Sequence, residues 1–86
     1  MDRRRELLNR LSRGHTQNVA FRDLVHLCQG FGFRLSSING SHHVFVHPAI
    51  AEQVNLQEVG GQAKPYQIRQ LLRLVERYNL RLEDES

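Results

Sequence analysis

The stretch from Phe33 to Pro48, FRLSSINGSHHVFVHP, decides the fold because it holds two apolar-rich runs joined by a turn signal. The dipeptide Asn39-Gly40 favours a tight turn, since both residue types tolerate a positive φ. We therefore predict a hairpin whose first strand runs from Phe33 to Ile38 and whose second strand runs from Ser41 to His47. Pro48 should end the second strand, because proline has no N–H to donate to a ladder.

Helical patterns flank this hairpin. Apolar residues recur at three- and four-residue spacing in three segments, which predicts helices from Arg3 to Arg13, from Ala20 to Gln29 and from Pro65 to Tyr78. A weaker alternation predicts a third strand from Val54 to Val59, followed by a flexible connection through Gly60-Gly61-Gln62-Ala63. The order helix, helix, strand, strand, strand, helix predicts an α+β two-layer sandwich, in which helices cover one face of a three-stranded antiparallel sheet.

Length and charge narrow the class of protein. A chain of 86 residues is long enough for one domain and one core. The formal net charge is +3, and every basic residue except Lys64 is an arginine. The planar guanidinium fork of arginine matches phosphate oxygens, so the composition is compatible with a nucleic-acid partner. Many solvated helix faces are equally rich in arginine, so the composition alone does not select this partner.

The single cysteine, Cys28, lies in an apolar helical pattern and is expected to be a small core residue. One cysteine allows neither an intramolecular disulfide nor a cysteine-based metal site. No apolar run is long enough to span a bilayer, and residues 1–5 lack the apolar stretch of a signal peptide. We therefore expect a cytoplasmic protein without membrane contact.

Three histidines, His42, His43 and His47, fall within six positions of the second strand. Because successive side chains of a strand point to opposite faces, His42 shares a face with Val44 and Val46, and His43 shares the other face with Phe45 and His47. We expect the valine face to meet the helices. His42 would then stay accessible only because it lies at the start of the strand, beside the turn.

The order of short motifs along the chain resembles the HicA family of small toxin ribonucleases. The motifs that carry this resemblance are Phe31-Gly32-Phe33-Arg34, Gly40-Ser41-His42-His43, His47-Pro48, Lys64-Pro65 and Ile68-Arg69-Gln70-Leu71-Leu72. The resemblance extends from Phe21 to Leu80. It implies a fold similar to a double-stranded RNA-binding domain and divides the chain into an N-terminal helix and loop (1–19), a HicA-like domain (20–80) and a charged tail (81–86).

The resemblance also implies an activity and a partner. It places the catalytic histidine of the family on His42, and it implies cleavage of mRNA and neutralisation by a cognate antitoxin of the HicB type. One departure concerns the third strand, which in the family often carries a Val-Pro-Val-His type of segment. The corresponding residues Val54 to Val59 contain neither proline nor histidine, which puts the acid–base pairing in question.

RNA cleavage of this kind requires no metal or cofactor. RNA carries its own nucleophile, the 2′-OH, so an enzyme needs a base, an acid and cations for the phosphate charge. A zinc site made of histidines is not expected, because His43 and His47 lie roughly 13 Å apart along a strand. The candidate RNA-binding residues beside the catalytic His42 are Ser41, His43, Phe45, His47, Lys64, Arg69 and Arg73.

Each candidate also has a purely structural interpretation. Ser41 could be a polar turn residue, His43 and His47 ordinary residues of a strand surface, and Phe45 a packing residue. Arg69 and Arg73 form one stripe with Arg77, and such a stripe could be a solvated helix face. Two other functions therefore remain open, a non-catalytic RNA-binding module of the same fold and a protein-interaction domain with no role in RNA binding.

Overall fold

An antiparallel sheet and a set of helices form the computed structural model, which describes residues 3–83. The helices are α1 (Arg3–Ser12), α2 (Phe21–Gly30) and α3 (Pro65–Arg77), and the strands are β1 (Arg34–Asn39), β2 (His42–Val46), β3 (Val54–Val59) and β4 (Gln62–Ala63). The predicted α+β class is therefore confirmed, and each predicted helix and strand begins and ends within a residue of its observed bounds.

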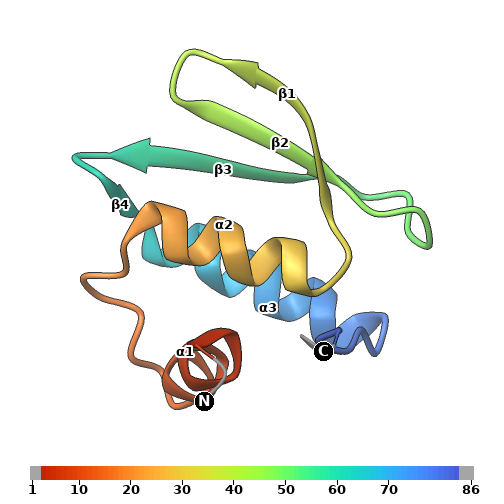
Figure 1. Ribbon diagram of the computed structural model, residues 1–86, viewed down its shortest axis with the longest axis horizontal. Coiled ribbons are helices and arrows are strands. Elements are labelled where there is room, and N and C mark those ends of the chain that lie inside the picture. Colours follow the sequence, from red (N-terminus) through yellow and green to blue (C-terminus); the bar gives the residue numbers. More distant parts are fainter. Residues whose placement is uncertain (1–2, 84–86) are drawn as a thin grey trace.

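The sheet has four antiparallel strands in the order β1-β2-β3-β4. Helices α2 and α3 lie against one face of it, and α1 packs on the side of α2 that points away from the sheet (Figure 1). The apolar side of α1 contributes Leu11, which is 2% exposed, to the common core. This first helix therefore forms an outer layer and leaves the opposite face of the sheet open.

Two local predictions are wrong. The hairpin turn consists of Gly40 and Ser41, because Asn39 still pairs with His42, and Gly40 takes the positive φ of +62°. The segment predicted as a flexible connection contains the fourth strand, β4. This strand forms because residues 19–21 pair with its outer edge, through hydrogen bonds from Ala63 N to Val19 O and from Phe21 N to Gly61 O, each 2.9 Å long.

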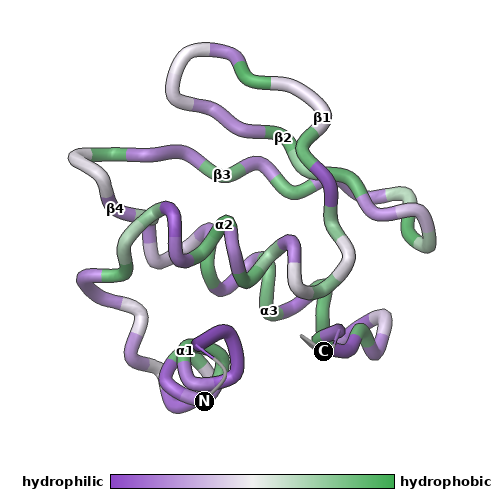
Figure 2. Tube along the Cα trace, in the orientation of Figure 1, coloured by the Kyte–Doolittle hydropathy of each residue, from purple (hydrophilic) through white to green (hydrophobic). Residues whose placement is uncertain are grey.

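The core lies between the sheet and the helices. Apolar segments alternate with polar ones along α2 and α3, so each helix has one side suited to burial (Figure 2). The core residues that are at most 1% exposed are Val19, Leu24, Leu27, Cys28, Phe45, Val54, Leu56, Ile68 and Leu71. Cys28 is the small core residue expected from the sequence, and its burial raises the pKa of the thiol to about 12.

The predicted orientation of β2 is also wrong. Phe45 is 1% exposed and points to the helices, and the half-buried Val44 lies on the other face. Phe45 pairs with Leu35 on β1 and with Val54 on β3, and Val54 is 0% exposed, so the face of β2 that carries the phenylalanine ring is the one that meets the helices. His42 is therefore exposed because it belongs to the open face and not because it lies at the end of the strand.

Candidate active site on the open face of the sheet

Strand register places His42 in a row of polar residues. Its neighbours across the strands are Asn39 on β1 and Gln57 on β3, and directly paired residues share one face of a sheet. The next row on the same face consists of Ser37, Val44 and Asn55. We call these two rows the open face. Apart from Val44, the residues around His42 on it are neutral amides and hydroxyls.

The ring of His42 has one side-chain partner. Its Nδ1 lies 3.3 Å from Oδ1 of Asn55, which is the diagonal neighbour on β3. The adjacent turn is held in a similar way, because Nε2 of Gln57 donates to Oγ of Ser41 at 3.3 Å and Glu58 N donates to Ser41 O at 3.1 Å. The exposed imidazole and the Ser41 hydroxyl therefore lie close together at the mouth of the hairpin.

His43 and Phe45 lie on the helix side, contrary to the prediction. The half-buried ring of His43 packs on Phe21 of α2 with 4.8 Å between ring centroids, and its Nδ1 lies 3.2 Å from Ser41 O. Phe45 is 1% exposed, so its ring has no free face on which a base could stack. Phe45 therefore belongs to the hydrophobic core, as its structural interpretation expects.

His47 is held by the backbone on both sides of its ring. Nε2 donates to Phe31 O at 3.0 Å, and Nδ1 accepts from Ala49 N at 3.0 Å. The ring also meets Phe33 edge-on at 5.1 Å, and a Cβ added at Gly32 would lie only 2.9 Å from Nε2. Both ring nitrogens are therefore used to join the end of β2 to the end of α2, which supports the structural interpretation of His47.

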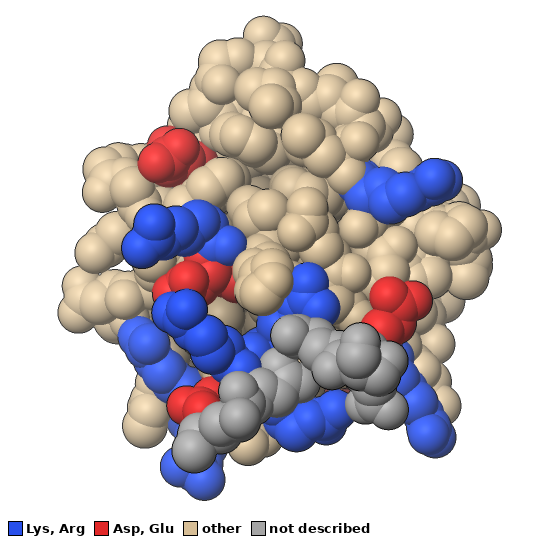
Figure 3. Space-filling view, viewed as in Figure 1, with Lys and Arg blue, Asp and Glu red and all other residues tan. Residues whose placement is uncertain are grey.

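The two predicted arginines belong to a different layer of the domain from His42. Arg69 and Arg73 are exposed on α3, which lies on the helix side of the sheet. Lys64 precedes this helix and places its Nζ 5.8 Å from the ring centroid of Tyr66. Lys and Arg side chains gather over the lower half of the view in Figure 3, where α1 lies, and the tip of the β1–β2 hairpin carries none.

Arg77, the last member of the predicted stripe, is part of a surface cluster that joins α3 to the loop before β3. Its Nη1 lies 3.0 Å from Oε2 of Glu52, and the Tyr78 hydroxyl donates to the same carboxylate. The hydrogen bond from Tyr78 lowers the pKa of Glu52, and Glu52 raises the pKa of Tyr78. This cluster anchors the loop, so Arg77 has a structural role.

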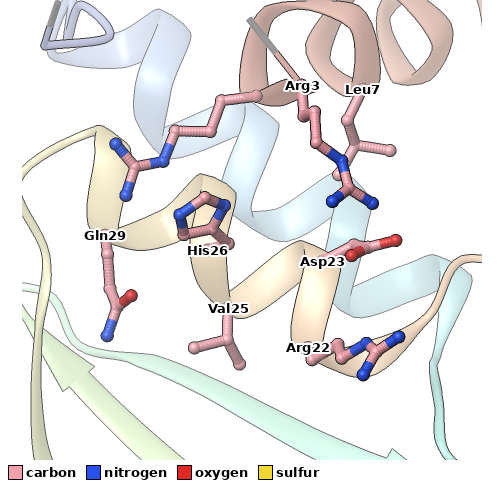
Figure 4. A pocket seen from close by; sticks show the side chains of 8 residues that line it. Arg3, Leu7, Arg22, Asp23, Val25, His26 and Gln29 are labelled. Carbon is pink, nitrogen blue, oxygen red and sulfur yellow. The ribbon is translucent and has the colours of Figure 1, made fainter. Parts of the chain in front are cut away.

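A groove between α1 and α2 is lined by several basic side chains. Figure 4 shows Arg3 reaching from α1 toward Asp23, with Arg22, His26 and Gln29 along α2. The hollow is about 330 Å³ in volume. It lies on the helix side, so it does not contribute side chains to the face that carries His42.

Within residues 3–83, no three His, Cys, Asp or Glu side chains are placed to hold one metal ion. The same part of the chain contains no helix that is both long and apolar enough to cross a membrane. Comparison with protein-family models, with curated proteins and with solved structures finds no match for this chain. The candidate site must therefore be judged on its own geometry.

The neighbours of His42 could not be predicted from the sequence alone. Asn39, Asn55 and Gln57 surround the ring in the structure, and none of them was a candidate. The polar positions of β3 were visible as an alternation with Val54 and Leu56. The missing information was the register between β2 and β3, because these strands are joined by a loop and not by a tight turn.

Proposed function

We propose that this chain is a toxin ribonuclease of the HicA type, which cleaves mRNA without a metal cofactor and is neutralised by a separate antitoxin of the HicB type. The observation that carries the proposal is the exposed imidazole of His42, held by Asn55 on the open face. An imidazole titrates near neutral pH, so it can remove and return a proton under cellular conditions. The resemblance in motif order supports the same assignment.

The chemistry follows from the structure of RNA. Nε2 of His42 removes the proton of a 2′-OH, the 2′ oxygen attacks the adjacent phosphorus, and the bond from phosphorus to the 5′ oxygen breaks. The leaving 5′ oxygen takes a proton from water, because the side chains flanking His42 are amides and a hydroxyl. The products are one fragment with a 2′,3′-cyclic phosphate and one with a 5′-hydroxyl.

Substrate contacts near the bond to be cleaved would come from Ser41 and from the two amides in the same row as His42, those of Asn39 and Gln57. These groups donate and accept hydrogen bonds but carry no charge, so they suit base edges and 2′-hydroxyls. Arg69 and Arg73 lie on the opposite side of the sheet. An RNA strand bound at His42 would reach them only by passing around an edge of the domain.

The test uses an oligonucleotide with one cleavable site. We expect the wild-type protein to form a 2′,3′-cyclic phosphate end, and a single 2′-deoxy substitution at the site to abolish cleavage. His42→Ala should lower the cleavage rate by about 10²–10⁴-fold while the domain stays folded. The matched control is His15→Ala, which removes another exposed histidine from the loop after α1 and should leave the rate unchanged.

Two results would contradict the proposal. Undiminished cleavage by a folded His42→Ala protein would remove this histidine from the mechanism. RNA binding by the wild-type protein without any cleavage would identify the chain as a non-catalytic RNA-binding module.

The antitoxin is tested in cells. We expect expression of the chain to arrest growth, His42→Ala to relieve the arrest, and coexpression of a neighbouring small gene to relieve it as well. The proposed partner would cover His42 and the open face. Growth arrest that persists with His42→Ala would separate toxicity from RNA cleavage.

A further inference from the structure

We infer that Asn55 is a positioning residue, which holds the His42 ring with its proton on Nδ1 and thereby keeps the lone pair of Nε2 free. The inference rests on the proposed ribonuclease function, because only a ring that acts as a base benefits from this orientation. It adds to that proposal a residue from β3, the strand that departs most from the family pattern.

The contact between Asn55 and His42 determines which ring nitrogen of His42 carries the proton. Oδ1 of Asn55 lies 3.3 Å from Nδ1 of His42. An amide oxygen only accepts hydrogen bonds, so the hydrogen between the two atoms belongs to Nδ1. A neutral imidazole carries one N–H, so Nε2 is then the unprotonated nitrogen that can act as a base. The contact therefore selects one of the two tautomers of the neutral ring.

Asn55 lies on a rigid part of the sheet. Val54 and Leu56, which flank Asn55 on β3, are both 0% exposed and fix the strand against the helices. The pairing of Val44 with Asn55 fixes the register of β3 against the strand that carries His42. The backbone of Asn55 is therefore well anchored, and its exposed side chain projects from this part of the sheet beside His42.

The residue type at position 55 is unusual for a strand. Asparagine is depleted in strands, where β-branched and aromatic residues are favoured. A strand position that breaks its local preference is often one that serves a site. The other nearby amide on β3, that of Gln57, already donates to Ser41 Oγ at 3.3 Å. These contacts assign Asn55 to the ring and Gln57 to the turn.

The experiment reads the tautomer directly and needs no substrate. Long-range ¹H–¹⁵N correlation spectra of the RNA-free protein distinguish the two ring nitrogens of a neutral histidine. We expect the Nδ1–H form of His42 to dominate in the wild-type protein. Asn55→Ala should return the ring to the Nε2–H form that free imidazole side chains prefer, whereas Asn55→Asp should keep the Nδ1–H form, because a carboxylate also accepts from Nδ1.

Cleavage kinetics supply the second readout. Losing one hydrogen bond of ordinary strength corresponds to a decrease of about 3- to 10-fold in kcat for Asn55→Ala, with little change in KM. Asn9→Ala is the matched control, because it removes the amide of an exposed asparagine on α1, which lies on the helix side of the sheet and away from His42. It should leave both the tautomer and kcat unchanged.

The outcomes separate this inference from the proposed function. An Nε2–H form in the wild-type protein, or a tautomer unaffected by Asn55→Ala, would overturn the positioning role even if the protein cleaves RNA. An Nδ1–H form that depends on Asn55, in a protein that cleaves no RNA, would support the orientation of the ring and overturn the ribonuclease proposal.

Discussion

The two faces of β2 use the same residue types for opposite purposes. On the open face, His42 has one side-chain partner and its ring is exposed. On the helix side, His43 packs on Phe21, and beyond the end of the strand both ring nitrogens of His47 are taken by the backbone. The role of an imidazole therefore depends on its neighbours across the sheet, and its nearness to other histidines in the sequence does not predict it.

The largest expected effect comes from removing the aromatic ring on the helix side. Phe45→Ala should destabilise the domain by about 3–5 kcal/mol, because it deletes a ring that is 1% exposed and leaves a cavity. A natural domain has only about 5–15 kcal/mol of stability, so this variant is expected to be near the limit of folding. Urea unfolding followed by circular dichroism measures the change.

The matched control for this variant is Val44→Ala, one residue earlier on the open face, where the side chain is half-buried. It should cost clearly less than Phe45→Ala. Equal losses for the two variants would contradict the assignment of the two faces.

An intermediate effect is expected for His47. His47→Ala removes two hydrogen bonds to the backbone and an edge contact with Phe33, which should cost about 1–3 kcal/mol. For a domain of this size, each 1 kcal/mol lowers the Tm by about 4–8 °C. Thermal unfolding of His42→Ala in parallel should show a change within about 0.5 kcal/mol, because the ring of His42 is exposed. A larger loss of Tm for His42→Ala than for His47→Ala would reverse the proposed roles.

The smallest loss of stability is expected at β1, where the helices do not cover the sheet. Ile38, His43 and Leu56 form one row across three strands, but Ile38 is 56% exposed and Leu56 is 0% exposed. Ile38→Ala should therefore change the free energy of unfolding by only about 0.5 kcal/mol, whereas Leu56→Ala should cost about 2–5 kcal/mol. Similar losses in urea unfolding would mean that packing at β1 contributes more than its exposure indicates.

Local sequence patterns predicted the helices and strands well. The periodic apolar residues of α2 and α3 and the alternation of β3 place these elements within a residue of their observed bounds. The orientation of β2 was not predicted, because it depends on whether Phe45 or the valines meet the helices, which alternation alone leaves undecided. β4 was missed because two residues form a strand only when residues 19–21 pair with them.

In the candidate site, too, local features could be predicted from the sequence and tertiary contacts could not. Local motifs identified His42 and its sequence neighbour Ser41, and both are exposed at the hairpin. The contact between His42 and Asn55 depends on strand register, and the separation of Arg69 and Arg73 from His42 depends on which layer α3 occupies. Both are tertiary relations between residues far apart in the sequence. Local sequence patterns therefore do not predict them.

The two margins of the sheet differ, and this limits how the domain can associate with itself. At β4, residues 19–21 occupy the outer backbone groups, and the Gln67 side chain accepts from Gln57 N at 2.7 Å on the same side of β3. At β1, all residues from Arg34 to Asn39 are exposed, and no other strand in residues 3–83 pairs with its outer side. If two molecules paired through their β1 strands, the accessible sheet edge of both would be occupied. Such association would stop at a pair of molecules, so the architecture does not favour growth into a fibril.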